Sequence, residues 1–352
     1  MENKGHKIQT AIIGFGLSGR VFHAPFISTH AGFKLFKVVE RKGNLSKDLY
    51  PDVEIVRDYK DLLKDDNLEL VIIATPNILH FDLAREFLSA GKHVVVEKPF
   101  TPSSAEADEL LKLSEETGKK IFVFQNRRWD GDFKTIQQVV YQGYLGEILE
   151  FEAHFDRFAP GSRRSAWRDE ALPAGGVLYD LGSHLIDQAL VLFGLPYSIF
   201  ADIRAQRKGS QVDDCFEVNL FYEKLKVTLK ASVFVKEKGP RYILHGTKGS
   251  FIKYGIDPQE EMLKQGLMPD SEAWGKEDPD YWGILNTELH GQQFYGTIET
   301  EAGNYMGFYD NLHEVITKGS GQAVLPEEAR NVIRIIELAF ESHRSKSIIT
   351  LT

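Results

Sequence analysis

Residues 8–125 alternate short apolar runs with amphipathic helical stretches, and this rhythm restricts the folds that the chain can adopt. Several runs are apolar at consecutive positions, as expected of strands that are buried on both faces of a parallel sheet. The helical stretch 103–118 opens with a capping box, Ser103 and Glu106, and ends at Gly118. Repeated strand–helix units need right-handed crossovers, so we predict a doubly wound α/β domain. The predicted strands are 8–13, 34–39, 68–74, 93–97 and 121–124.

After Gly146 the pattern changes, because polar and apolar residues now alternate with a period of two. Such strands have one wet face and one covered face. We therefore predict an N-terminal α/β domain, residues 1–126, and a C-terminal α+β domain, residues 127–352, whose last strand or helix is a candidate to pack back on the first domain. The predicted strands of the second domain are 147–158, 214–222 and 225–235, and its predicted helices are 181–194, 305–319 and 326–344. The polar segment 257–283 is predicted to be a long surface excursion.

Charge and composition exclude some classes of function. The 352 residues carry a formal net charge of −9, which disfavours a nucleic-acid partner. No apolar stretch is long enough for a membrane helix, so no membrane partner is expected. Cys215 is the only cysteine, so an intrachain disulfide is impossible and a cytoplasmic location is expected.

A glycine-rich loop follows the first predicted strand. Gly14, Gly16 and Gly19 form the pattern G-x-G-x-x-G, which in this context predicts a dinucleotide site with the pyrophosphate at the following helix. The alternative is a bare glycine turn. The residues predicted to contact the cofactor are Gly14, Phe15, Gly16, Leu17, Gly19, Glu40, Arg41, Thr75, Pro76, Asn77, His80, Glu97 and Lys98.

The end of the second predicted strand leaves the choice of cofactor open. Glu40 lies where a carboxylate would accept hydrogen bonds from the adenosine ribose of NAD. Arg41 and Lys42 follow directly, and their charges suit the 2′-phosphate of NADP. A solvated loop is the alternative for these two bases.

Three residues are candidates to carry the chemistry. Lys98 follows the strand 93–97 and lies at a carboxyl end, where ligands bind in open α/β sheets. Asp180 and His184 are four residues apart on a predicted helix, so a carboxylate can orient and tune an imidazole. The alternatives are a lysine that snorkels to solvent, a helix cap and a packed histidine.

Two basic segments are candidates for contact with a substrate. Asn126 and Arg127 follow the fifth predicted strand, and Trp167 lies in an arginine-rich loop after residue 157. Guanidinium groups there could bind the hydroxyl groups or a carboxylate of a small molecule. A solvated basic loop is the alternative.

The motifs together resemble one family. GFGLSGRVFHAP, ATPN, GKHVVVEKPF, QNRRWDGDF and GGVLYDLGSHLIDQ occur in the order and spacing of the glucose–fructose oxidoreductase/inositol dehydrogenase/MocA family, over essentially the whole chain. Within it the sequence is most similar to the NADP-dependent scyllo-inositol dehydrogenase group. The resemblance implies an N-terminal Rossmann domain and a C-terminal domain with a large, open, mostly antiparallel sheet, which in the family commonly forms the interface of a homodimer or homotetramer.

The resemblance also implies an activity and roles for residues. The expected protein is an NAD(P)-dependent dehydrogenase that moves hydride between a secondary hydroxyl of a cyclic polyol or sugar and nicotinamide, at a site between the domains that needs no metal. Lys98 would bind the reacting oxygen, Asp180 and His184 would be the acid–base pair, and the bond before Pro99 would be cis. The alternatives are an NAD-dependent glycoside hydrolase and a non-catalytic ligand-sensing regulator on the same fold.

Overall fold

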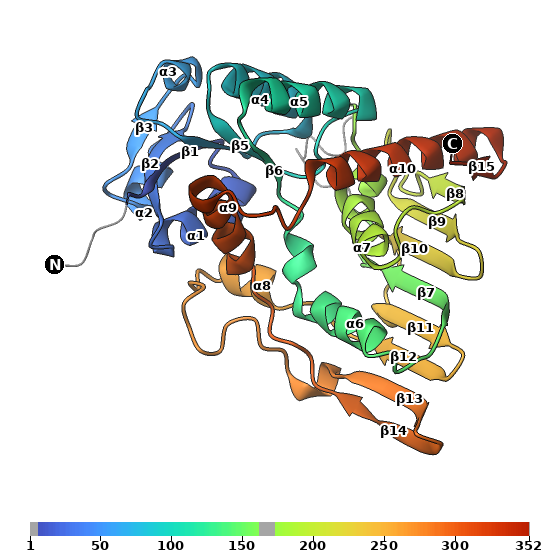
Figure 1. The fold of residues 1–352 in the computed structure, drawn as a ribbon. Helices are drawn as coiled ribbons and strands as arrows, with labels where there is room; N and C mark the ends of the chain where they lie inside the picture. The colour runs from blue at the N-terminus through green and yellow to red at the C-terminus, as the bar shows by residue number, and fades with distance from the viewer. Residues whose placement is uncertain (1–5, 162–172, 352) are drawn as a thin grey trace. The chain divides into compact units, whose positions relative to one another are not determined.

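The computed structural model describes residues 6–161 and 173–351 (Figure 1). The chain divides into two compact units. Unit 1 comprises residues 1–126, 259–274 and 305–330, and unit 2 comprises residues 127–258, 275–304 and 331–352. The first boundary falls after Asn126, where the sequence pattern also changes. The predicted second domain, 127–352, differs from unit 2, because two later segments group with unit 1.

Unit 1 contains a six-stranded parallel sheet with the order β3-β2-β1-β4-β5-β6. This order reverses next to β1, as in doubly wound folds that bind dinucleotides. The four residues of β4 and the last three of β5 are buried, which is why their sequences are apolar without alternation. The strands are β1 (Ile8–Ile13), β2 (Phe33–Val39), β3 (Glu54–Val56), β4 (Leu70–Ile73), β5 (His93–Val96) and β6 (Ile121–Val123).

Helices cover both faces of this sheet (Figure 1). The capping box predicted for α5 is present: Ser103 Oγ accepts from the amide of Glu106, and the Glu106 carboxylate accepts from the amide of Ser103. Gly118 closes this helix with a φ of +66°. The helices before residue 126 are η1 (Ser18–His23), α1 (Ala24–Thr29), α2 (Leu45–Leu49), α3 (Lys60–Leu63), η2 (Asn77–Leu79), α4 (His80–Ser89) and α5 (Ser104–Thr117).

Two helices from late in the sequence complete unit 1. These are α8 (Gln259–Lys264) and α9 (Met306–Lys318). Tyr309 of α9 stacks on Phe26 of α1 with 5.0 Å between ring centroids, and this apolar contact is why the late segment groups with the first unit. The prediction of a surface excursion over 257–283 is wrong for its first part, because Gln259 and Trp274 are buried and joined by a 3.0 Å hydrogen bond.

Unit 2 contains a nine-stranded sheet with the order β14-β13-β12-β11-β7-β10-β9-β8-β15. Only β7 and β10 pair in parallel, so the sheet is mostly antiparallel, as the family resemblance implied. The strands are β7 (Ile148–His154), β8 (Ser198–Arg204), β9 (Cys215–Phe221), β10 (Lys226–Ser232), β11 (Tyr242–Gly246), β12 (Gly249–Lys253), β13 (Gly283–Leu289), β14 (Gln292–Ile298) and β15 (Ile349–Thr350).

The helices of unit 2 pack on one face of its sheet (Figure 1). Inward residues such as Phe151, Tyr242 and Leu244 are buried, whereas their neighbours along each strand are more exposed, which explains the period of two. The helical segments are η3 (Asn126–Trp129), which starts at the boundary, α6 (Gly131–Tyr141), η5 (Leu178–Gly182), α7 (Ser183–Phe193), η6 (Pro279–Tyr281) and α10 (Pro326–Ser345), whose first turn belongs to unit 1.

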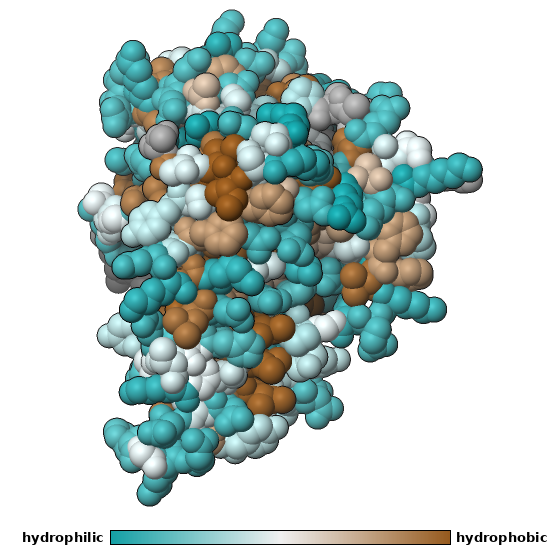
Figure 2. Space-filling view, turned by 90° about the vertical axis from the view of Figure 1, so that its right-hand side faces the viewer, coloured by the Kyte–Doolittle hydropathy of each residue, from teal (hydrophilic) through white to brown (hydrophobic). Residues whose placement is uncertain are grey.

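The outward face of the same sheet has no helix over it among the described residues. Ile243, Ile252 and Ile284 are cross-strand neighbours on three adjacent strands and form an apolar row there. The side of the molecule turned to the viewer in Figure 2 is mostly hydrophilic, with apolar residues gathered in short strips. In the described part of the chain, no helix has both the length and the apolar character that crossing a bilayer requires.

Candidate functional site

The glycine loop between β1 and η1 has the shape of a nucleotide cradle. Gly14 has a φ of +93°, and a Cβ atom there would lie 2.6 Å from the carbonyl oxygen of Ala74. A Cβ at Gly19 would overlap the carbonyl oxygen of Gly14. A Cβ at Gly16, in contrast, would have no atom of the protein within 4 Å. The fold therefore requires the first and third glycines, and the second leaves room for a pyrophosphate against the backbone.

Glu40 lies at the end of β2, but its carboxylate is already bonded within the protein. It accepts hydrogen bonds from the amides of Leu45 and Ser46, at 3.0 and 3.1 Å, and from the Ser46 hydroxyl at 2.7 Å. It therefore caps the N-terminus of α2. Arg41 and Lys42 are exposed and are neither hydrogen-bonded nor ion-paired to any described residue.

The segment after β4 carries four predicted cofactor residues, Thr75, Pro76, Asn77 and His80. Thr75 Oγ1 is buried and has no hydrogen-bond partner among the described residues, which fits a group that receives a ligand. Asn77 is buried and accepts from the amide of Ile78 at 3.0 Å. His80 is 1% exposed, with ring nitrogens 2.9 Å from the Pro99 carbonyl and 3.1 Å from the Thr75 carbonyl. His80 thus ties the loops after β4 and β5 together.

Lys98 is held at the end of β5 by its neighbour Glu97. The Glu97 carboxylate accepts from the amide of Lys98 at 3.0 Å, from the Ser18 hydroxyl and from His23 Nε2 at 3.1 Å. Burial pushes the pKa of Glu97 upward, but His23, Ser18 and Lys98 outweigh it, so the pKa lies below its usual value. The Lys98–Pro99 peptide bond is cis, as expected.

The opposite side of the His23 ring is also bonded. Its Nδ1 lies 2.9 Å from the hydroxyl oxygen of Tyr309, which donates to the carbonyl oxygen of Phe22 at 2.6 Å. The glycine-loop helix η1, the end of β5 and α9 are therefore joined in one buried network. Glu97 thus holds the backbone amide of Lys98, and its predicted contact with the cofactor stays a prediction.

Asp180 and His184 lie where a short π-helix becomes an α-helix. Asp180 is in η5 and His184 is in the first turn of α7. π-Turns of this kind are frequent at functional sites, because they change which side chains share a face. His184 is 4% exposed and packs edge-on against Phe155, with 6.4 Å between ring centroids.

Helix α7 is fixed by three polar contacts within unit 2. Asp187 binds the guanidinium of Arg128 in a bidentate pair, at 2.7 and 2.9 Å. Gln188 donates to the carbonyl of Arg127 at 3.0 Å and accepts from the Tyr242 hydroxyl at 2.9 Å. Asp187 and Gln188 lie three and four residues after His184, so these contacts set the rotation of the helix and hence the direction of the imidazole.

Asp213 supports the start of the same segment. Its carboxylate accepts from the amide of Leu178 at 2.7 Å and lies against Gly176, whose φ is +92°. Burial raises the pKa of Asp213 to about 6, although the amides of Leu178 and Val177 pull it down. The sequence analysis missed Asp213, which lies 33 residues after Asp180 in the chain.

The predicted substrate residues have different surroundings. Asn126 is buried at the last position of unit 1. Arg127 is 8% exposed, pairs with Asp130 at 3.0 Å and lies over the ring of Phe155, which lines the surroundings of His184. Trp167 lies outside the described residues.

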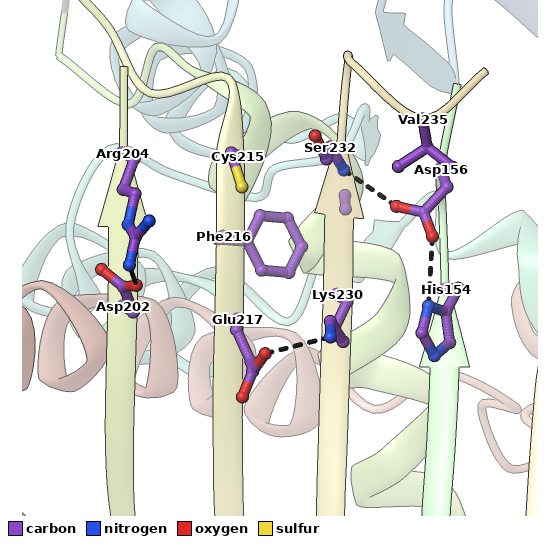
Figure 3. A pocket seen from close by; sticks show the side chains of 11 residues that line it. His154, Asp156, Asp202, Arg204, Cys215, Phe216, Glu217, Lys230, Ser232 and Val235 are labelled. Carbon is purple, nitrogen blue, oxygen red and sulfur yellow. Dashed lines mark hydrogen bonds and ion pairs between the residues drawn. The ribbon is translucent and has the colours of Figure 1, made fainter. Parts of the chain in front are cut away.

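A polar hollow of about 320 Å³ on the outward sheet face is a weaker candidate site (Figure 3). Its charged groups neutralise one another: Glu217 pairs with Lys230 at 3.1 Å, and Asp156 accepts from His154 at 3.1 Å. Asp202 and Arg204 form a third pair. Among the described residues, no group of three or more His, Cys, Asp and Glu side chains has the arrangement of a metal site.

Comparison with known proteins assigns both units to one family. Residues 8–125 match the family model described as "Oxidoreductase family, NAD-binding Rossmann fold". Residues 137–351 match the model described as "Oxidoreductase family, C-terminal alpha/beta domain".

Similar proteins match over nearly the whole chain. The scyllo-inositol 2-dehydrogenase (NADP(+)) IolW of Bacillus subtilis is 39% identical, over 98% of this chain and 96% of its own. The uncharacterized oxidoreductase YdgJ of Escherichia coli is 40% identical, over 98% of this chain and 99% of its own. The protein yvaA of Bacillus subtilis has a solved structure with a TM-score of 0.94 and 38% identity, covering 99% of this chain and 99% of its own. The solved structure of a protein of Bacteroides fragilis has a TM-score of 0.91 and 43% identity, covering 98% of this chain and 100% of its own.

The two family matches agree with the glycine loop, whose shape fits a dinucleotide. The chain belongs to the Gfo/Idh/MocA oxidoreductase family, and it is an NAD(P)-dependent dehydrogenase that acts on CH–OH groups.

Proposed function

We propose that the substrate is a cyclic polyol or sugar whose secondary hydroxyl is oxidised, as in inositol dehydrogenases. The observation that carries this proposal is the 39% identity to a scyllo-inositol 2-dehydrogenase over 98% of the chain. The alternatives of a glycoside hydrolase and of a ligand-sensing regulator have no comparable support.

Three side chains are proposed to perform the chemistry. His184 accepts the hydroxyl proton, and Asp180 orients the imidazole and stabilises its charged form. Lys98 donates a hydrogen bond to the same oxygen and stabilises the negative charge that develops on it. Bound nicotinamide supplies the hydride acceptor. Support for Lys98 comes from the buried Glu97 carboxylate, which fixes the backbone amide of the lysine.

We propose NADP as the preferred cofactor. The carboxylate of Glu40 is engaged by α2, so it is a poor acceptor for ribose hydroxyls. Arg41 and Lys42 are exposed at the end of the same strand and suit a 2′-phosphate. The name of the Bacillus subtilis relative IolW specifies NADP(+), which agrees with this preference.

A homodimer or homotetramer in the cytoplasm completes the proposal. The apolar row of Ile243, Ile252 and Ile284 on the outward sheet face is its support, because a second copy could cover these side chains. The single cysteine is compatible with a reducing compartment.

A substrate panel tests this function. Purified protein is mixed with scyllo-inositol, myo-inositol and common sugars, and reduction of NADP and NAD is followed by nicotinamide absorbance. The proposal expects turnover of at least one cyclic polyol or sugar, with NADP preferred. Release of an aglycone without net NADPH would instead identify the glycoside hydrolase alternative.

A further inference from the structure

A cavity of about 590 Å³ lies in unit 2 at the ends of β7, β11 and β12, and we call it the strand-end cavity. Aromatic and charged side chains share its lining, which is typical of a pocket for a small polar molecule. Its aromatic residues are Phe155, Tyr254 and Tyr281; its acidic residues are Asp156, Glu277 and Asp278; its basic residues are Lys238, Arg241 and Lys276.

The acidic residues of the strand-end cavity are already bonded within the protein. Asp156 accepts from His154 and from the amide of Ser232, both at 3.1 Å. Glu277 binds the buried ammonium of Lys253 at 2.7 Å and the Thr300 hydroxyl at 2.7 Å. Asp278 caps η6 by accepting from the amide of Asp280 at 3.0 Å. These three carboxylates are therefore already bonded to groups of the protein.

The basic residues of the cavity have fewer bonds to other groups of the protein. Arg241 is 5% exposed and donates from Nη1 to the carbonyl of His154, but its Nε and Nη2 have no hydrogen-bond partner among the described residues. Asp132 is the nearest carboxylate, 3.7 Å from Nε. Lys238 and Lys276 are exposed and have no ion pair or hydrogen bond within the described chain. Unpaired donors on a buried guanidinium are costly unless a ligand satisfies them.

Phe155 connects the strand-end cavity to His184. One face of its ring lies 3.6 Å from the guanidinium carbon of Arg241, and its ring packs edge-on against the imidazole of His184. Phe155 therefore contacts both Arg241 and His184.

We propose that the strand-end cavity binds an oxyanion, a carboxylate or a phosphate, carried by the polyol or sugar that reaches His184. Arg241 donates to the oxyanion from the floor of the cavity, and Lys238 and Lys276 add positive charge at its rim. The inference rests on the proposed function, since it names the substrate class of the same site as acidic polyols and sugars.

Calorimetric titration of the protein tests this inference without turnover. Glucuronate is compared with glucose, and myo-inositol 1-phosphate with myo-inositol, so that the two arms separate carboxylate from phosphate. At least one acid is expected to bind about 10-fold more tightly than its neutral parent, and more weakly as NaCl is raised, because exposed charges are screened. Equal binding of acid and parent, or no binding of either acid at millimolar concentration, contradicts the inference.

Variants assign the preference to the cavity. Arg241→Gln is expected to reduce the ratio of acid to parent affinity by about 10-fold or more. The exposed pair Lys238→Gln/Lys276→Gln avoids the risk of misfolding and is expected to reduce the ratio about 3-fold or more. Lys224→Gln, an exposed lysine on the same unit paired with Glu147, is the control that leaves the ratio unchanged. A ratio that survives both Arg241→Gln and the lysine pair places the oxyanion elsewhere and refutes the inference.

The outcome is separable from that of the proposed function. Turnover of neutral inositols, together with equal binding of acids and their neutral parents, refutes the oxyanion site and leaves the proposed function intact. Tight, Arg241-dependent binding of glucuronate by a protein that oxidises no polyol or sugar sinks the proposed function alone.

Discussion

The Ser46 hydroxyl donates a 2.7 Å hydrogen bond to the carboxylate of Glu40, at the position where a ribose-binding acid would be expected. The carboxylate is thereby part of the cap of α2, and the adjacent Arg41 is proposed to select the cofactor. Arg41→Ala is expected to raise the KM for NADP about 10-fold or more and to leave the KM for NAD nearly unchanged, because a charge-assisted phosphate contact is lost. Steady-state kinetics with both cofactors measures this. Arg85→Ala, an exposed arginine paired with Asp82 on α4, is the control. Equal changes for both cofactors would show that Arg41 does not contact the 2′-phosphate.

The glycine loop supplies a matched pair of variants. Gly16→Val should fold normally and lose cofactor binding, because a Cβ atom there meets no protein atom within 4 Å and the side chain fills the phosphate space. Gly19→Val should fail to fold stably, since its Cβ would overlap the carbonyl of Gly14. Circular dichroism and cofactor titration distinguish the two. Normal NADP affinity in a folded Gly16→Val protein would refute the cradle.

Glu97 is predicted to act through Lys98. Glu97→Gln keeps the volume of the side chain but removes the charge of the carboxylate, which accepts hydrogen bonds from Ser18, His23 and the Lys98 amide. It is expected to lower kcat by about 10-fold or more and to destabilise the protein by about 1–3 kcal/mol, as for a disrupted buried charge network. The depressed pKa of Glu97 means that its stabilisation is present at neutral pH and is lost as the pH falls, so the variant and the wild type should converge in acid. Constant separation of their unfolding midpoints across pH would contradict this role.

Asp213 should change stability with pH in the opposite direction. Its pKa of about 6 lies above the ordinary value of 3.8, so the folded protein binds this proton more tightly than the unfolded chain. The ionised carboxylate therefore costs stability as the pH rises from about 4 to about 6, by roughly 3 kcal/mol at most. Asp213→Asn resembles the protonated form, so its stability relative to the wild type should increase as the pH rises from about 4 to about 6. Denaturant unfolding at pH 4.5 and pH 8 measures the difference, and a gain that is equal at both pH values would argue against a titrating Asp213.

Much of unit 1 could be predicted from the sequence because its signals are local. The apolar runs of β4 and β5, the capping box of α5 and the glycine loop each lie within a few consecutive residues. The short helix α2 has no apolar periodicity, so nothing in the sequence indicated that Glu40 would cap it.

Unit 2 was less predictable because its site residues meet through sheet pairing. Arg241 reaches Phe155 only because β11 pairs with β7, a contact between residues more than 80 positions apart. Asp213 reaches the start of η5 in the same long-range way. Likewise, α9 joins unit 1 through aromatic contacts such as Phe26 with Tyr309, which no local pattern encodes.

His184 and Lys98 are predicted to act on one oxygen, so their effects should be coupled. His184→Ala is expected to lower kcat by about 10²–10⁴ and to flatten the rise of the oxidation rate with pH. The double variant His184→Ala/Lys98→Met should lose less than the product of the two single effects, since residues that act as a unit are not additive. Fully multiplicative losses would mean that the two groups serve separate steps.

The most direct test of the central claim is the kcat of Lys98→Met with a polyol or sugar that the wild type oxidises. Methionine retains most of the apolar stem of lysine and deletes the charge that is proposed to stabilise the reacting oxygen. We predict a decrease in kcat of about 10²–10³ with little change in NADP affinity, as for the loss of one strong polar stabiliser of a transition state. A Lys98→Met enzyme that oxidises this substrate at nearly the wild-type kcat would contradict the account.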